Sequence, residues 1–197
     1  RLQSFYEAHQ ELAGLSDWQS LKGSILEHLA EALVQIGART IVLELHVAKH
    51  LKELTGDTPE ERYQSFVRTK LLEPDSLEFI YKEYPVLTRL LMLRTHYLVA
   101  AVTEALSRYI EDAGLIQREL LNGSERLISL SAGLGDAHQQ GRTVMRFHFT
   151  GDRVILYKPK SLSMAKHYFE LLNWFNDKGF TPPFRGHDVI DRNGYAW

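Results

Sequence analysis

Apolar residues recur at the spacing of an α-helix along the chain from Leu2 to about Asn122. Residues three and four positions apart share one face of a helix, so this spacing predicts helices that each bury an apolar stripe. The longest stripe follows Pro85, a residue that suits the first helical position. Its members are Leu87, Leu90, Leu91, Leu98, Ala101, Val102, Ala105 and Tyr109. The sequence therefore predicts a mostly helical chain in which this stripe packs in the core.

Three short patterns predict where helices begin. Ser16, Thr58 and Asp75 each stand three residues before a Gln or Glu, the spacing of a capping box. We expect the helix after Ser16 to run to Ile36 and to end at Gly37, because glycine often follows the last helical residue. Residues 40–54 keep one apolar face at helical spacing and are predicted to form a separate helix.

The pattern changes near residue 123 from helical spacing to alternation. Residues 127–130 are a short strand candidate, and residues 143–149 alternate between apolar and polar side chains. A turn at Thr150-Gly151-Asp152 leads into a second strand at residues 154–158, which predicts an antiparallel hairpin. Pro159 ends this strand because proline has no N–H to donate.

A further helix is predicted from Leu162 to Phe175, and a strand is expected near Val189. The inward residues of that helix are expected to be Leu162, Ala165, Phe169, Leu172 and Phe175. We predict an α+β chain that is predominantly α. Its expected parts are a helical subdomain at 1–122 and, at 123–197, a glycine loop, a hairpin and a helix.

Residues 131–160 contain the groups that a phosphate-binding site needs. Glycines let backbone N–H groups approach phosphate oxygens, and three of them precede or begin the hairpin: Gly133, Gly135 and Gly141. Lys158, at the end of the second strand, can supply a cation to the same oxygens. Glu170, on the next helix, is the candidate partner of Lys158. Leu156 and Val154 alternate with intervening residues, so they share a strand face with Lys158 and can form an apolar wall beside a nucleotide base.

Each of these residues also has an ordinary structural interpretation. The glycines lack the strict G-x-G-x-x-G spacing, and a lysine before proline is usually solvated. Asp136 can bond backbone N–H groups of its own turn, and His138 can be a surface residue. Glu170 can equally face solvent. From the residues alone, a nucleotide site and an ordinary loop followed by a hairpin both remain open.

Composition excludes several other classes. The formal net charge of −2 gives no general attraction to nucleic acid, and no apolar run reaches the length of a transmembrane helix. The chain has no cysteine, which excludes disulfides and thiol chemistry within it. His46 and His50 lie four residues apart, but no third ligand stands near them, so no metal site is predicted.

Several segments resemble one family, the class II lanthipeptide synthetases (LanM family). Residues 135–142, GDAHQQGR, resemble its G-D-x-H-x-x-G-R motif, and residues 157–162, YKPKSL, resemble its Y-K-P-R-S-L motif. Residues 54–66 and 84–90 are similar to its L-x-G-[DE]-T-x-E-E-R-[FY] and Y-P-x-L-x-R patterns. Residues 171–174 and 194–197 are also similar to family segments, so the resemblance spans nearly the whole chain.

The resemblance implies part of the dehydratase domain of a bifunctional bacterial enzyme. Such enzymes use ATP and Mg²⁺ to phosphorylate Ser and Thr of a precursor (leader-core) peptide. They then eliminate phosphate to give dehydroalanine or dehydrobutyrine. The fold implied for residues 123–197 is a kinase-like N-lobe. By this resemblance Lys158 contacts nucleotide phosphates, Asp136 and His138 act in the loop over them, and Arg142 belongs to the same nucleotide-binding motif.

The family also implies partners: the rest of the dehydratase domain and a zinc-dependent cyclase domain, which are absent from this sequence. The implied location is the bacterial cytoplasm, with membrane association through a transporter complex as a further possibility. Lys160 departs from the family's arginine and cannot form the same bidentate contact. Because the chain stops before the family's catalytic loop and metal-binding aspartates, we expect no turnover from it alone. The alternatives are a helical scaffold or leader-peptide-binding module, and a lipid or small-molecule kinase of the same fold.

Overall fold

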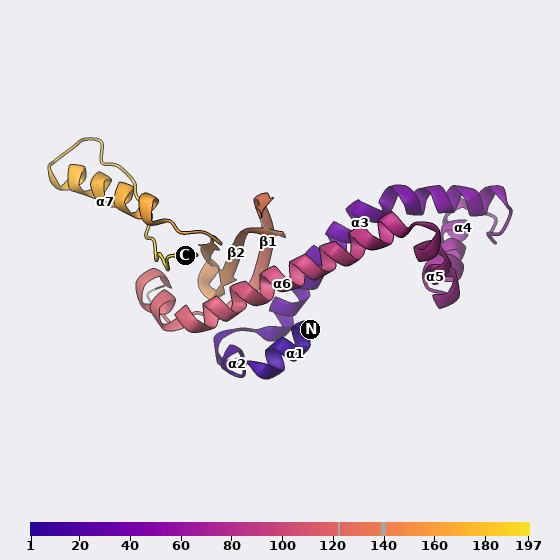
Figure 1. Cartoon of the computed structure of the whole chain (residues 1–197), viewed down its shortest axis with the longest axis horizontal. Helices are drawn as coiled ribbons and strands as arrows, with labels where there is room; N and C mark the ends of the chain where they lie inside the picture. The colour runs from indigo at the N-terminus through magenta and orange to yellow at the C-terminus, as the bar shows by residue number, and fades with distance from the viewer. Residues whose placement is uncertain (122, 139–140) are drawn as a thin grey trace. The chain divides into compact units, whose positions relative to one another are not determined.

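The computed structural model describes residues 1–121, 123–138 and 141–197, with side chains for all of these except 135–138. Figure 1 shows its helices and its small sheet. The elements in chain order are α1 (Leu2–Ala8), α2 (Glu11–Leu15), α3 (Trp18–His50), α4 (Pro59–Phe66), the π-helix η1 (Val67–Leu71), α5 (Pro74–Glu83), α6 (Pro85–Ile116), the π-helix η2 (Gln117–Leu121), β1 (Leu127–His138), β2 (Arg142–Phe149), the 3₁₀ turn η3 (Thr150–Asp152), β3 (Arg153–Tyr157) and α7 (Ser163–Asp177). The described chain is mostly helical with one antiparallel sheet, which confirms the predicted fold class.

The described residues form two compact units. The sheet unit comprises Arg1–His28 and Tyr97–Trp197, and the helical unit comprises Leu29–His96. Both α3 and α6 supply residues to each unit. The change from helix to strand does occur near residue 123, but residues from α1, α2, α3 and α6 are grouped with the strands that follow. A domain boundary at residue 123 therefore stays a prediction.

Within the helical unit, the capping box at Thr58 is confirmed. The Thr58 hydroxyl accepts from the Glu61 N–H at 3.2 Å, and the Glu61 carboxylate accepts from the Thr58 N–H at 3.1 Å. The box predicted at Asp75 is wrong, since α5 already begins at Pro74 and no side chain caps it. The fixed backbone angle of proline suits the first helical position, which moves the helix start ahead of Asp75.

Gly56, just before this capping box, is predicted to be the glycine of the helical unit that tolerates substitution least. Its φ is +123°, and an added Cβ would lie 2.4 Å from the Glu61 Cβ. We expect Gly56→Ala to lower the free energy of unfolding by about 2 kcal/mol or more, measured by urea denaturation. The control is Gly37→Ala, where nothing lies within 4 Å of the added atom. This change should instead stabilise α3 by about 0.5–1 kcal/mol. Equal effects of the two substitutions would contradict this account of Gly56.

The predicted break at Gly37 is wrong, because α3 continues from Trp18 to His50 as one helix. A glycine weakens a helix interior by only about 1 kcal/mol, and the helix-forming residues on both sides outweigh this. The start of α3 also differs from expectation. The Asp17 carboxylate, rather than Ser16, accepts from the Ser20 N–H, at 3.3 Å. Ser16 instead donates its hydroxyl to the Leu12 carbonyl at 2.8 Å.

The sheet has the strand order β1-β2-β3, and both neighbouring pairs are antiparallel. The predicted hairpin is confirmed as β2 and β3, joined by a turn in which Gly151 has a φ of +67°. The glycine segment was expected to be a loop after a short strand at 127–130, and this is wrong. Its backbone continues β1 as far as His138 and pairs with β2 through several register shifts. Such irregularities accommodate extra residues without ending the strand.

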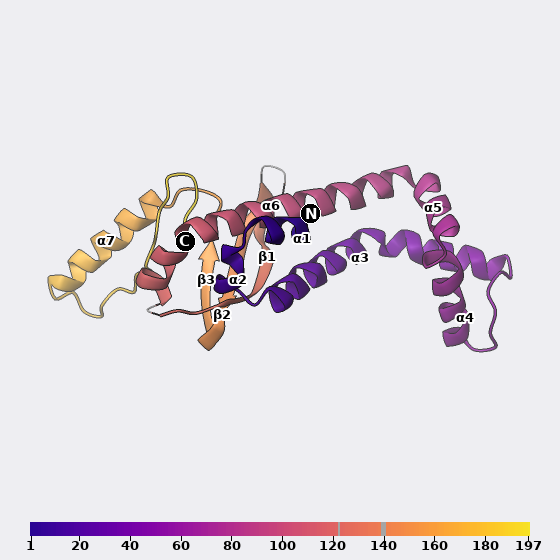
Figure 2. The ribbon, with the colours of Figure 1, turned by 90° about the horizontal axis from the view of Figure 1, so that it is seen from below.

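One face of the sheet forms an aromatic core with α6. The ring of Phe147 lies 5.1 Å from Trp197, 5.8 Å from Tyr109 and 6.2 Å from Tyr157, measured between centroids. All four side chains are buried. Figure 2 shows α6 crossing the three strands. Most of the predicted α6 stripe is buried here, although Leu90, in the helical unit, is exposed.

The C-terminal part is only partly packed. In α7 no residue is buried, although the predicted inward residues Ala165, Phe169 and Leu172 are half-buried, whereas Met164 and Trp174 are 85% and 53% exposed. Instead of a strand near Val189, backbone hydrogen bonds join Ile190 to Trp197, and Ala196 to Lys158, in both directions at 2.9 Å. No helix in the described part of the chain is long and apolar enough to cross a membrane.

Candidate functional site

The outer face of the sheet, opposite the aromatic core, carries the predicted apolar wall. Val154 and Leu156 are 51% and 44% exposed, whereas the alternating Ile155 is buried. In the register of β2 and β3, Leu156 faces Arg146 and Val154 faces His148. Residues directly opposite each other on antiparallel strands have adjacent side chains. This outer sheet face therefore combines apolar surface with basic or titratable groups, a combination suited to a flat ligand that carries negative charge.

Lys158 follows the outer sheet face at the end of β3. Alternation along the strand places it on the same side as Leu156. Its backbone N–H and carbonyl both pair with Ala196 at 2.9 Å, so the position of its main chain is fixed. Its side chain is half-buried, and its amino group forms no ion pair with any residue whose side chain is described.

Glu170 lies in α7 and bonds to another side chain. Its carboxylate lies 3.0 Å from the Nδ1 atom of His167, and this hydrogen bond lowers the pKa of Glu170. Both side chains are exposed. The predicted pairing of Glu170 with Lys158, whose side chains are both described, is therefore not formed in this structure, where Glu170 pairs with His167 instead.

The glycine segment is held in a specific backbone conformation. Gly133 and Gly141 have φ values of +82° and +89°, in the left-handed region that favours glycine. The Gly133 N–H donates to the hydroxyl of Thr143 at 2.8 Å, which ties β1 to β2. An added Cβ at Gly141 would lie 3.0 Å from the Cβ of Tyr97 on α6. Both glycines thus meet a conformational requirement of the backbone where β1 pairs with β2.

The remaining predicted residues of this segment are only partly described. Gly135, Asp136 and His138 belong to β1, but the side chains of Asp136 and His138 lie outside the described residues, as do residues 139–140. Their predicted roles at a phosphate stay predictions.

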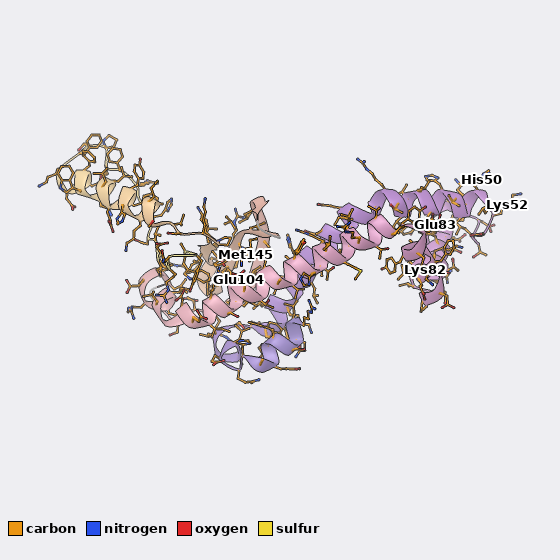
Figure 3. The ribbon with its side chains drawn as sticks, viewed as in Figure 1. His50, Lys52, Lys82, Glu83, Glu104 and Met145 are labelled. Atoms are coloured by element: carbon orange, nitrogen blue, oxygen red, sulfur yellow. The ribbon has the colours of Figure 1, made fainter. Side chains whose placement is uncertain are left out.

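Arg142, at the start of β2, is fixed by a residue that sequence reasoning missed. Its guanidinium binds both carboxylate oxygens of Glu104, at 2.8 and 3.0 Å. Glu104 also pairs with Arg108 at 2.6 Å, and Arg108 donates to the hydroxyl of Tyr157. Figure 3 labels Glu104 on α6 and Met145 on β2. Burial raises the pKa of Tyr157, while Arg108 acts in the opposite direction. This polar network therefore connects α6 to the beginning of β2 and the end of β3.

A second carboxylate on α6, Asp112, was also missed. It is 2% exposed and accepts hydrogen bonds from the C-terminal residues Tyr195 and Trp197, at 2.9 and 2.8 Å. The sequence did contain a signal, because Asp112 comes three residues after Tyr109 and thus lies on the buried side of the helix. An acidic residue in an apolar stripe requires donors in the core.

This arrangement offers apolar surface and charge for binding a ligand. Among the side chains that are described, no group of three His, Asp or Glu could hold a metal ion. The exposed apolar wall, with Lys158 beside it, can accept a ligand with an aromatic and an anionic part.

Two comparisons with known proteins agree with the motifs. Over 203 aligned residues the chain is 23% identical to the "Lacticin 481/lactococcin biosynthesis protein LcnDR2" of Lactococcus lactis subsp. lactis, a match that covers 98% of this chain and 22% of that protein. The chain thus spans less than a quarter of the length of this relative. The similarity confirms the resemblance to class II lanthipeptide synthetases. The pattern of one protein family also matches residues 84–197, more than half of the chain. The chain therefore belongs to the family described as "Domain of unknown function (DUF4135)".

Proposed function

We propose that this chain is part of the dehydratase domain of a lanthionine-forming enzyme in the bacterial cytoplasm. That enzyme would phosphorylate Ser and Thr residues of a precursor peptide with ATP. It would then eliminate phosphate to leave dehydroalanine or dehydrobutyrine. The ordered motifs and the similarity to a lacticin and lactococcin biosynthesis protein support a role in lanthipeptide synthesis. The observation that carries the kinase-like part of the proposal is the exposed outer sheet face ending at Lys158.

This face fits an adenine nucleotide in two respects. Val154 and Leu156 offer exposed apolar area for a base, and a base that covers them is removed from water along with them. Lys158 follows on the same side of the strand, where its ammonium group can neutralise phosphate oxygens. Phosphoryl transfer depends mainly on positioning and charge stabilisation. In this proposal Lys158 orients the phosphates, while the paired strands β1 and β2, with Gly133 and Gly141, keep the backbone beside them in place.

Mg²⁺ at such a site is usually held by one or two carboxylates together with substrate phosphates. We assign no Mg²⁺ ligand to the described residues and place those ligands in the rest of the parent enzyme. The cyclase domain with its zinc belongs to that enzyme as well. Arg142 stays a proposed member of the nucleotide site, positioned by its bidentate contact with Glu104.

A peptide-binding or scaffolding role is the second candidate, and one observation in the helical unit favours it. An open cavity of about 400 Å³ lies where α5 meets α6. It is lined by Tyr81, Lys82, Pro85, Thr88, Arg89, Met92 and Leu93. A mainly apolar floor with two basic residues is typical of a surface that holds a peptide helix. In this alternative the chain would bind a peptide without contacting ATP.

Titration of the chain with Mg-ATP distinguishes the two candidates. We expect Lys158→Ala to weaken ATP binding about tenfold to a hundredfold, because it removes one charge-assisted contact to phosphate. Lys166→Ala, which removes an exposed lysine on α7, is the matched control and should bind ATP like the wild type. Isothermal titration calorimetry gives the Kd of each variant. Equal affinity of wild type and Lys158→Ala would remove the support for a nucleotide site and favour the scaffold.

A further inference from the structure

Asp112 connects α6 to the last residues of the chain through three side-chain donors. The Tyr195 hydroxyl and the Trp197 indole N–H donate to its Oδ2 atom at 2.9 and 2.8 Å. The Arg192 Nε atom lies 3.1 Å from its Oδ1 atom. The Asp112 side chain is only 1% exposed. A buried carboxylate is stable only when donors satisfy its oxygens, so this contact requires residues 192–197 to keep one position.

The same C-terminal residues hold the backbone at Lys158 and again shortly after it. Ala196 stands between Tyr195 and Trp197 and pairs with Lys158 through two hydrogen bonds of 2.9 Å. Asp191 accepts from the Leu162 N–H at 2.8 Å and from the Ser161 hydroxyl at 3.0 Å. The C-terminal clip, residues 190–197, therefore contacts the chain at Lys158 and again three and four residues later.

We propose that Asp112 is a positioning residue that fixes the backbone of Lys158 through the C-terminal clip. Lys158 lies just after β3, which ends at Tyr157, and β2 pairs only as far as Tyr157. Beyond the end of the sheet, the backbone of Lys158 is therefore held by its hydrogen bonds with Ala196. Its consequence for ATP binding rests on the function proposed above. A fixed backbone confines the amino group of Lys158 to the region its own side chain can reach.

Hydrogen exchange in the 197-residue chain tests this proposal at the two amides concerned. Asp112→Asn preserves the shape of the side chain but turns one acceptor into a donor, which opposes the donors of the clip. Trp197→Phe is a gentler second variant that removes one donor and keeps a buried ring. We expect both variants to speed exchange of the Lys158 and Ala196 amides about tenfold or more, with little change in the amides of β2.

Two controls separate this effect from other causes. Glu111→Gln makes the same change of charge one residue earlier, on the exposed side of α6, and should leave exchange at Lys158 unchanged. Ile116→Val shortens a fully buried side chain of the same helix. It should lower the stability of the sheet unit without a selective increase at Lys158. Unchanged exchange in both test variants overturns the proposal, and so does an increase that is equally large in β2.

ATP titration of the same variants tests the consequence. We expect Asp112→Asn to weaken ATP binding about threefold to tenfold, and Ile116→Val to leave it unchanged. Faster exchange at Lys158 without weaker ATP binding would overturn the positioning role, provided that Lys158→Ala does weaken binding. If Lys158→Ala binds ATP like the wild type, the proposed function fails. The exchange rates alone then decide whether Asp112 fixes Lys158.

Discussion

Replacing Phe147 with alanine is expected to lower the free energy of unfolding of the sheet unit by about 3–5 kcal/mol. The Phe147 side chain is fully buried, and its ring contacts those of Tyr109, Tyr157 and Trp197. These three residues come from α6, β3 and the C-terminal clip, so the cavity left by the substitution would face all of them. The loss combines the transfer free energy of the removed ring with the cost of a cavity that the neighbours fill only in part.

Urea denaturation followed by near-ultraviolet circular dichroism measures this change, because the signal reports the packing of the aromatic rings. Phe79→Ala is the matched control, since Phe79 is 63% exposed. It should change the free energy of unfolding by no more than about 0.5 kcal/mol. A loss of about 1 kcal/mol is what removing a single buried methylene group would cause. If the free energy of unfolding of Phe147→Ala lies within that distance of the wild type, the aromatic cluster is not the core of this unit.

The second large effect concerns activity in the full-length enzyme that we propose contains this chain. Lys158→Ala should lower the rate of peptide dehydration by about 100-fold or more, because charge stabilisation at the phosphates dominates phosphoryl transfer. Initial rates with purified enzyme, precursor peptide and Mg-ATP give the comparison. Lys166→Ala should retain the wild-type rate. A Lys158→Ala enzyme with full activity would show that this lysine is dispensable.

Local sequence signals predicted the local structure well. The capping box at Thr58 needs only residues within one helical turn, and it is present as expected. The hairpin of β2 and β3 was also predictable, because alternation and a glycine turn specify it within sixteen residues, from residue 142 to residue 157. The helix start at Pro85 depends in the same way on its own residues.

The misplaced boundaries arise where one local signal is outweighed by the residues around it or by strand pairing. Gly37 was expected to end a helix, yet α3 passes through it because the apolar spacing resumes on the other side. The glycine segment was expected to be a loop, yet pairing with β2 extends the strand as far as His138. At Gly37 the helix-forming residues on both sides decide the outcome, whereas in the glycine segment long-range pairing with β2 decides it.

The contacts that position the candidate site could not be read from spacing, since they join distant residues. Glu104 and Arg142 are 38 positions apart, and Asp112 and Trp197 are 85 positions apart. A sequence shows that each residue has a charge or a donor, but only the fold shows which partner it meets. Lys158 and Leu156 were identified from one strand, whereas the residues that fix Lys158 come from α6 and the C-terminal clip.

Mass spectrometry of a precursor peptide produced together with the full-length enzyme tests the central claim most directly. The account predicts that the peptide loses one water for each modified Ser or Thr when the wild-type enzyme is present. With the Lys158→Ala enzyme, the peptide should stay almost unmodified. Unmodified peptide with a folded wild-type enzyme, or equal dehydration by both enzymes, would contradict the claim that this chain forms an ATP-binding part of a dehydratase.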